Sequence, residues 1–315
     1  MQHICLCAFE LGNFAVIIME GLSPEHNFLG ITEPQLYRYQ DSKVVIQQIP
    51  YEHTSSYVEG SAKGPAAVVS ASHYVEFYDE MLGTECYREL GICTLPELQF
   101  HGACNREAVD LIKDQTRRLL QDGKYVVSLG AEHTVTLGFV EAFLEQYPDL
   151  HVVQIDAHSD LRLSYHDNPF SHASVMARVH DLGVPLVQVG IRAQCREEAE
   201  LIRNSDRINT WYAHQIQDGE AWMDAAIAKL GKNVYLTIDA DGFDPSVVPA
   251  VGTAEPGGLT WWQGCRFLQK LAEQRNIVGF DIVEIAPREV DIISEFSMAK
   301  LLYRILGFLH LNKSI

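Results

Sequence analysis

Basic side chains are scarce in this sequence. It has 24 Lys and Arg residues against 42 Asp and Glu residues, which gives a formal net charge of −18 over 315 residues. Nucleic acids and anionic membrane surfaces bind proteins through dense positive charge. The sequence therefore disfavours both as partners. It suits a small cationic substrate, although an ordinary acidic surface would give the same count.

Paired cysteines are missing. The seven cysteines are scattered, their number is odd, and none forms a Cys-X-X-Cys pair. This spacing argues against a disulfide framework and against a structural zinc site, because both need cysteines in matched sets. We expect reduced thiols and a cytoplasmic location.

No stretch near the start is long and apolar enough to span a membrane. The apolar runs within the first 20 residues are interrupted by Glu10 and Asn13, and no basic segment precedes them. A membrane-spanning helix needs about 20 apolar residues, and a secretion signal begins with basic residues. We expect neither a signal nor an anchor, and Met19 is an alternative start of the native chain.

Long linkers, internal repeats and low-complexity tracts are also absent. Residues 1–40 show little periodicity and are interpreted as an N-terminal lead-in segment, and residues 41–315 as one domain. In that domain apolar runs alternate with helical spacing, which predicts right-handed crossovers and an α/β fold around a parallel sheet. The predicted strands are Lys43–Pro50, Tyr125–Leu129, His151–Ile155, Pro185–Arg192, Val234–Ile238 and Ile277–Ile285. The predicted helices are Ala66–Tyr74, Asn105–Asp122, Thr134–Tyr147, Ser171–His180, Glu197–Ile202, Gly219–Leu230, Trp261–Gln274 and Ile293–Leu311.

The stretch from His151 to Asp160 carries the most chemistry. A β-branched apolar run ends in Asp156, His158 and Asp160. Residues i, i+2 and i+4 of an extended chain point to one face. The end of a buried strand would therefore present two carboxylates and an imidazole to one point, which is costly unless a positive charge lies there.

Two other apolar runs end in the same kind of residue. One ends in Asp239 and Asp241, and the other runs out into His133. Open α/β sheets place their sites at the carboxyl ends of strands. Any one of these pieces alone is often a capped strand end or a turn. Together they favour a metal site.

Four carboxylates and two imidazoles suit a pair of divalent cations. An oxygen-rich, thiolate-poor set of ligands favours Mn²⁺ over structural zinc. Two cations about 3.5–4 Å apart can share a water and convert it to hydroxide near neutral pH. Such a centre hydrolyses amides, amidines, guanidines or phosphoesters.

The neighbouring residues bear on the choice among these substrates. A phosphatase would need cationic residues or a glycine-rich nest, and only Arg162 and Arg192 lie near the metal strands in the sequence. Glu284, at the end of a predicted strand, would instead hold a cation. His172 begins a predicted helix, and His53 lies on a loop. An ordinary solvated histidine is the alternative for both.

Five motifs together resemble the ureohydrolase family, which contains agmatinases and arginases. The resemblance extends from about Lys43 to Leu311. Two positions depart from the family pattern: Ala131 replaces a glycine and Ala254 replaces a proline, which affects loop shape and not the chemistry. The motifs are Leu129–Thr134, Asp156–Asp160, Thr237–Pro245, Val251–Leu259 and Gly279–Pro287.

This resemblance implies a three-layer α/β/α sandwich and two Mn²⁺ per chain, with Ni²⁺, Co²⁺ or Zn²⁺ as alternatives. It implies that a hydroxide bridging the metals attacks the guanidinium carbon and that the chain forms a homo-oligomer, a trimer or hexamer. It also implies roles for single residues. His133, Asp156, Asp160 and Asp239 would hold one metal, Asp156, His158, Asp239 and Asp241 the other, Glu284 and Thr253 would bind substrate, and His172 would be a proton shuttle.

The substrate is a guanidino compound under this resemblance. Arginases typically have acidic residues after a Gly-Ile-Arg stretch, where this chain has Ala193 and Cys195. The sequence therefore favours agmatine, which would give putrescine and urea. Arginine is the first alternative, followed by the substrates of a guanidinobutyrase or guanidinase. A catalytically silent binding protein of the same fold is the alternative from another class.

Overall fold

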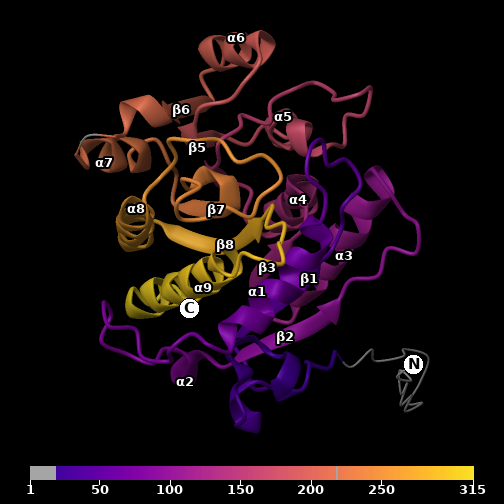
Figure 1. Cartoon of the computed structure of the whole chain (residues 1–315), viewed down its shortest axis with the longest axis vertical. Helices are drawn as coiled ribbons and strands as arrows, with labels where there is room; N and C mark the ends of the chain where they lie inside the picture. Colours follow the sequence, from indigo (N-terminus) through magenta and orange to yellow (C-terminus); the bar gives the residue numbers. More distant parts are fainter. Residues whose placement is uncertain (1–18, 218) are drawn as a thin grey trace.

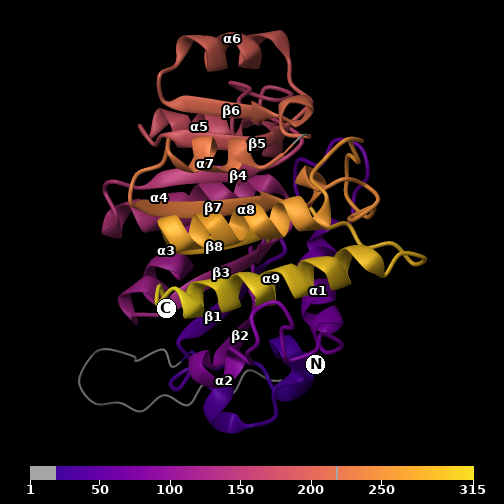
Figure 2. The same ribbon diagram turned by 90° about the vertical axis from the view of Figure 1, so that its left-hand side faces the viewer.

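A parallel β-sheet forms the centre of the molecule. The computed structural model describes residues 19–217 and 219–315. In these ranges the sheet has eight strands in the order β2-β1-β3-β8-β7-β4-β5-β6, and every neighbouring pair is parallel. Figure 2 shows the strands stacked in this order. The strands are β1 Val44–Ile49, β2 Ile92–Glu97, β3 Tyr125–Gly130, β4 His151–Ile155, β5 Leu186–Ile191, β6 Ile208–Tyr212, β7 Asn233–Asp239 and β8 Asn276–Val283.

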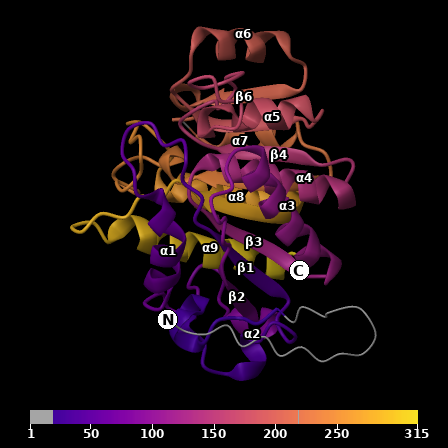
Figure 3. The same cartoon turned by 90° about the vertical axis from the view of Figure 1, so that its right-hand side faces the viewer.

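Helices cover both faces of the sheet, which confirms the predicted three-layer sandwich (Figures 1 and 3). Side chains of α1, α7, α8 and α9 pack in one apolar cluster, and those of α3, α4 and α5 pack in the other. Successive strand residues alternate between the clusters, as strand geometry requires: Val152 joins one and Val153 the other. The helices are α1 Gly64–Ser72, α2 Tyr87–Leu90, α3 Arg106–Gln121, α4 Thr136–Gln146, α5 Val175–Asp181, α6 Arg196–Asn204, α7 Ala221–Ile227, α8 Trp261–Gln274 and α9 Ile293–Leu311.

The strand order determines where a site can form. The chain leaves β3 and re-enters the sheet as β4 three positions away, and β8 and β7 fill the gap between them. The carboxyl ends of β3, β8, β7 and β4 are therefore neighbours. A change in strand order of this kind opens a crevice outside the strand ends.

The six predicted strands are all present, and the structure adds the two edge strands, β2 and β6. Neither has an alternating apolar pattern: β2 contains Pro96, and β6 contains Asn209 and Thr210. Edge strands tolerate proline and polar residues because one side has no partner strand. Helix α5 begins at Val175 and not at the predicted Ser171, because His172–Ser174 forms a 3₁₀ turn.

The described part of the lead-in segment packs on the edge of the sheet, whereas residues 1–18 lie outside the described ranges. Asn27 is fully buried. Its side-chain amide donates to the carbonyl of Ile92, and its Oδ1 accepts from the backbone N–H of Thr94 at 2.8 Å. The side chain thus pairs backbone groups of β2 that lack a partner strand on that side. No helix in the described ranges has the length and apolar character needed to cross a membrane.

We expect Asn27→Ala to lower the free energy of unfolding by about 2–3 kcal/mol, because it leaves a buried carbonyl and a buried N–H unpaired. Urea denaturation measures the change. Thr32→Ala is the control in the same segment, since Thr32 is exposed, and it should cost less than about 0.5 kcal/mol. Equal effects of the two substitutions would show that Asn27 does not anchor the segment.

Candidate metal centre

Three strands of the sheet, β3, β7 and β4, deliver the predicted ligands to one place. Asp156, His158 and Asp160 follow β4, Asp239 ends β7 and Asp241 lies in the 3₁₀ turn after it, and His133 begins the 3₁₀ turn after β3. Asp160 has φ +55° and Glu284, after β8, has φ +65°. A non-glycine residue in this region costs of order 1–3 kcal/mol, and such strain gathers at functional sites.

The first group centres on Nδ1 of His133. This atom lies 3.0 Å from Oδ2 of Asp156, 3.1 Å from Oδ2 of Asp160 and 3.4 Å from Oδ2 of Asp239. It is buried and has no hydrogen-bond partner. Nε2 of the same ring lies 2.9 Å from Oγ1 of Thr237.

The contacts of Thr237 settle which nitrogen of His133 carries the proton. Oγ1 of Thr237 donates its own proton to Oδ1 of Asp281 at 2.6 Å. It must therefore accept from Nε2–H of His133, so Nδ1 carries the lone pair whenever the ring is neutral. Burial lowers the pKa of His133, but Asp156, Asp160 and Asp239 outweigh it and raise that pKa well above its usual value. Positive charge is therefore needed at Nδ1, either a proton or a metal ion that takes the place of the proton. The donor set fits a divalent metal.

The second group centres on His158. Its Nδ1 lies 3.0 Å from Oδ2 of Asp241 and 3.7 Å from Oδ1 of Asp156. Asp156 therefore offers one oxygen to each imidazole. Two sets of ligand atoms lie close enough to hold an ion, namely His133 with Asp156 and Asp239, and Asp156 with His158 and Asp241. One shared carboxylate between two such sets is the arrangement of a binuclear centre.

The charges of these groups conflict when no cation is present. Burial, followed by the charge of Asp156, raises the pKa of Asp160 to about 7. Burial, followed by the charge of Asp241, raises the pKa of Asp239 well above its usual value. Burial lowers the pKa of His158, but Asp241 and Asp156 outweigh it and raise that pKa to about 12. Divalent cations would remove this conflict, because they favour ionised carboxylates and neutral imidazoles.

A chain of buried amides holds Asp156. Nε2 of Gln154 donates to Oδ2 of Asp156 at 2.7 Å, Nε2 of Gln188 donates to Oε1 of Gln154 at 2.6 Å, and Oγ1 of Thr210 donates to Oε1 of Gln188 at 2.8 Å. These residues come from β4, β5 and β6, and every donor points toward Asp156. The sequence pattern did not single them out. The available signal was a glutamine within each of two apolar strand runs.

The predicted substrate residues line a small pocket beside the two groups. His172, Thr253 and Glu284 lie in its wall together with loop residues 55–58. Burial, followed by the charge of Glu132, raises the pKa of Glu284 to about 8. Burial, followed by the charge of His158, lowers the pKa of His172 to about 4, so its ring is neutral near pH 7. His53 is exposed and does not line this pocket.

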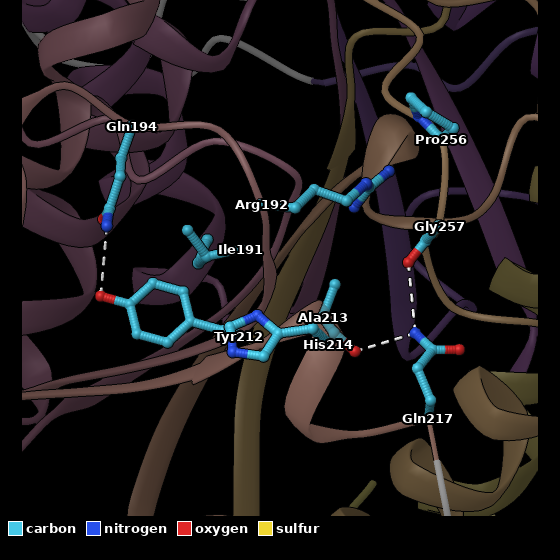
Figure 4. Close-up of a pocket in the computed structure, with 9 residues that line it drawn as sticks. All are labelled: Ile191, Arg192, Gln194, Tyr212, Ala213, His214, Gln217, Pro256 and Gly257. Atoms are coloured by element: carbon cyan, nitrogen blue, oxygen red, sulfur yellow. Dashed lines mark hydrogen bonds between the residues drawn. The ribbon is translucent and has the colours of Figure 1, made fainter.

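A larger hollow of about 590 Å³ lies nearby and contains none of the predicted ligands (Figure 4). Arg192 at its edge donates to the carbonyl of Asp241 at 2.5 Å and to that of Glu255 at 2.8 Å. Its guanidinium therefore secures the chain after β7 and is not available to hold a phosphate. The residues that line this hollow are Ile191, Arg192, Gln194, Tyr212, Ala213, His214, Gln217, Pro256 and Gly257.

The chain is similar to known proteins over most of its length. Residues 42–307 match the model of the arginase family. An N(1)-aminopropylagmatine ureohydrolase of Synechocystis sp. is 43% identical over 276 residues, which cover 86% of this chain and 90% of that protein. An agmatinase of Bacillus anthracis is 35% identical over 257 residues, covering 79% and 85% of the two chains. The crystal structure of agmatine ureohydrolase of Thermoplasma volcanium superposes with a TM-score of 0.78 at 30% identity, covering 94% of this chain and 96% of that one.

We expect Gln154→Leu to raise the dissociation constant for Mn²⁺ by about 10- to 100-fold, the usual effect of losing a residue that orients a metal ligand. Isothermal titration of the metal-free chain measures it. Gln47→Leu is the matched control. Gln47 is also a fully buried glutamine on a strand, but its amide donates to Thr116 and Ser128, and neither of these is a predicted ligand. An unchanged affinity in Gln154→Leu would mean that the amide chain is only structural.

Proposed function

The chain belongs to the arginase family, and from this premise we propose that it releases urea from a guanidino compound with a cationic amine tail. It is a hydrolase of guanidino C–N bonds, as the named members of the family are. The single observation that carries the site assignment is the buried Nδ1 of His133, which has no hydrogen-bond partner and faces three carboxylates. Such a group of side chains needs positive charge at its centre.

The family depends on a binuclear metal centre, and the metal assignment to this chain is our proposal. We assign Mn²⁺ to both positions, with Ni²⁺, Co²⁺ or Zn²⁺ able to occupy the same ligands. When bound, the cations supply a nucleophile from water at neutral pH. His133, Asp156, Asp160 and Asp239 would hold one cation, and Asp156, His158, Asp239 and Asp241 the other.

Side chains in the pocket wall bind the substrate and transfer the proton. Glu284, in the pocket wall, pairs its carboxylate with the guanidinium of the substrate, and Thr253, whose Oγ1 lies 3.4 Å from Oδ2 of Asp241, lies beside that position. His172 is neutral at pH 7 and lines the same pocket. It can take a proton from the attacking water and return it to the departing amine nitrogen.

An arginase activity has less support. Glu198 is the buried carboxylate closest in sequence to Ala193 and Cys195, and each of its two oxygens accepts a backbone hydrogen bond. It accepts from the backbone N–H of Cys195 at 2.6 Å and from that of Leu161 at 2.9 Å. It therefore caps helix α6 and the loop after β4, and is not free to bind an α-amino group.

The length of the amine tail is the remaining choice. Agmatine would give putrescine and urea, and N(1)-aminopropylagmatine would give spermidine and urea. The Synechocystis relative that carries the second name is 43% identical to this chain, whereas the agmatinase of B. anthracis is 35% identical. We propose N(1)-aminopropylagmatine as the preferred substrate, with agmatine second. A cationic tail also suits a chain with a net charge of −18.

Urea release tests this proposal. The Mn²⁺-loaded protein is given N(1)-aminopropylagmatine, agmatine, arginine, guanidinobutyrate and guanidine in parallel. We expect kcat/KM to be highest for N(1)-aminopropylagmatine, lower for agmatine, and at least about 100-fold lower for the two substrates with a carboxylate, because their charge would lie unpaired near the acidic site. A higher kcat/KM for arginine than for the two amines would refute the proposed substrate class. If the protein holds two metals and releases urea from none of the compounds, the alternative of a catalytically silent binding protein would be favoured.

We expect Asp239→Asn to abolish nearly all urea release and to reduce bound Mn²⁺ below the two per chain of the parent, because it removes a charge that both cations share. Elemental analysis after desalting gives the metal content. Asp244→Asn, a carboxylate from the same motif that bonds Ser246 and Gly257 in a turn, is the control and should keep both metals. Full turnover with full metal in Asp239→Asn would show that Asp239 is not shared.

We also propose a cytoplasmic location and a homo-oligomer, a trimer or hexamer. Five cysteines in the described ranges have free thiols, which fits a reducing compartment. Val290 and Ile292 expose 97% and 76% of their surface, and contact with a second copy would bury this apolar area. Sedimentation velocity measures the assembly, and a monomer would contradict it.

A further inference from the structure

We infer that Thr54 is a positioning residue that holds the imidazole of His172 and determines which of its two nitrogens faces the pocket. The inference rests on the proposed function, in which His172 moves a proton during urea release. Thr54 lies on the loop after β1, and this loop approaches the loop after β7 at the pocket: the carbonyl oxygen of Val58 lies next to Gly252. Figure 3 shows the two loops on the same side of the sheet.

The hydroxyl of Thr54 has three polar neighbours. Its Oγ1 lies 3.0 Å from Nδ1 of His172 and 3.1 Å from Oε1 of Glu132, and it accepts from the backbone N–H of His172 at 3.1 Å. A hydroxyl has one proton to donate and two lone pairs to accept with. Three neighbours therefore use its whole capacity.

Glu132 determines the direction of these bonds. It is fully buried, and its Oε2 accepts from the backbone N–H groups of His53 at 2.9 Å and Thr54 at 2.6 Å. Its Oε1 accepts from Oγ1 of Thr134 at 2.7 Å and from Oγ1 of Thr54. All four contacts are donated to Glu132, so the single proton of the Thr54 hydroxyl points to the carboxylate.

The proton on His172 follows from this count. The hydroxyl of Thr54 donates its only proton to Glu132, so it can only accept from the ring of His172. Nδ1 of the neutral imidazole must therefore carry a hydrogen. Nε2 is then the nitrogen with a lone pair. This is the form that can take a proton when water adds to the guanidinium carbon and return it to the nitrogen of the departing amine, after which the ring is neutral again.

The loop that carries Thr54 is itself fixed. The carboxylate of Glu52 accepts from Oγ of Ser55 at 3.0 Å and from the backbone N–H groups of Gly60 at 2.7 Å and Ala62 at 3.0 Å. Glu52 closes the loop on itself, and Glu132 ties it to the motif that carries His133. Thr54 therefore meets His172 from a rigid support, as a positioning residue must.

The first test compares two substitutions at Thr54. Thr54→Val keeps the shape and removes the hydroxyl, and it should lower kcat by about 10- to 100-fold, a part of the roughly 10²- to 10⁴-fold that general acid–base catalysis supplies. KM and bound metal should not change. Thr54→Ser restores the hydroxyl and should recover most of the loss. Equal kcat in Thr54→Val and the parent would overturn the inference.

Thr134→Val is the matched control. Thr134 is buried and donates to the same oxygen of Glu132 as Thr54 does, but its hydroxyl has no contact with His172. The substitution should therefore lower the melting temperature with a loss of kcat below about threefold, within the scatter of a structural hydrogen bond. A loss of kcat as large as that of Thr54→Val would show that any disturbance of Glu132 lowers turnover. That result would overturn the inference about Thr54.

Glu132→Gln tests the direction of the proton without changing the shape. The two backbone N–H groups keep the amide oxygen on their side, so the NH₂ group faces the hydroxyls of Thr134 and Thr54. The Thr54 hydroxyl then accepts from Gln and donates to Nδ1 of His172, which moves the ring proton to Nε2. We expect kcat to fall although both metals stay bound.

A double-mutant cycle with His172→Asn asks whether Thr54 acts through His172. In the His172→Asn background Thr54→Val should cause no further loss, because residues that act as a unit are not additive. Independent, multiplicative losses would overturn the inference. The cycle uses whichever guanidino compound gives most urea, so an error in the preferred substrate does not affect it.

A spectroscopic measurement separates this inference from the proposed function. The ¹⁵N spectrum of the histidines in the chain loaded with diamagnetic Zn²⁺ reports the proton position on neutral His172. We expect it on Nδ1 in the parent and on Nε2 in Glu132→Gln. A proton on Nε2 in the parent would overturn the inference whether or not any substrate is turned over, and absence of turnover alone would count only against the proposed function.

Discussion

Repulsion among carboxylates at one end of a buried sheet is the constraint on which the rest of this structure depends. Asp156, Asp160 and Asp239 converge on Nδ1 of His133, and all four side chains are buried. Left to themselves these groups would separate, because each destabilises the others. The free energy that keeps them together comes from the sheet and its covering helices, and bound cations would remove the repulsion.

Two kinds of support share this task. The ligands are fixed from behind by groups on strands, with Thr237 and Asp281 orienting His133 and Gln154 orienting Asp156. The groups that would meet substrate are carried instead by loops at the strand ends, which two carboxylates, Glu52 and Glu132, close and tether. The site therefore combines predicted ligands that are held from the strands with a pocket wall that is carried by loops.

The sequence allowed the meeting of the predicted ligands to be foreseen because strand ends gather at one edge of a parallel sheet. The period of two was the wrong reason, because β4 ends at Ile155 and Asp160 has φ +55°. The strands β2 and β6 could not be recognised, since polar residues and a proline obscure their pattern. The bond from Thr54 to His172 spans 118 residues, and no local pattern reveals such a contact. The roles of the ligands, Glu284, Thr253 and His172 stay predictions.

The strand order also has a consequence for biosynthesis. Strand β8, residues 276–283, lies between β3 and β7 in the middle of the sheet although it is the last strand in the described sequence. While the ribosome is still making the chain, His133 after β3 has no fixed neighbour on the β7 side. The ends of β3, β7 and β4, which carry the predicted ligands, can therefore be brought into their final arrangement only after β8 has been made and has entered the sheet.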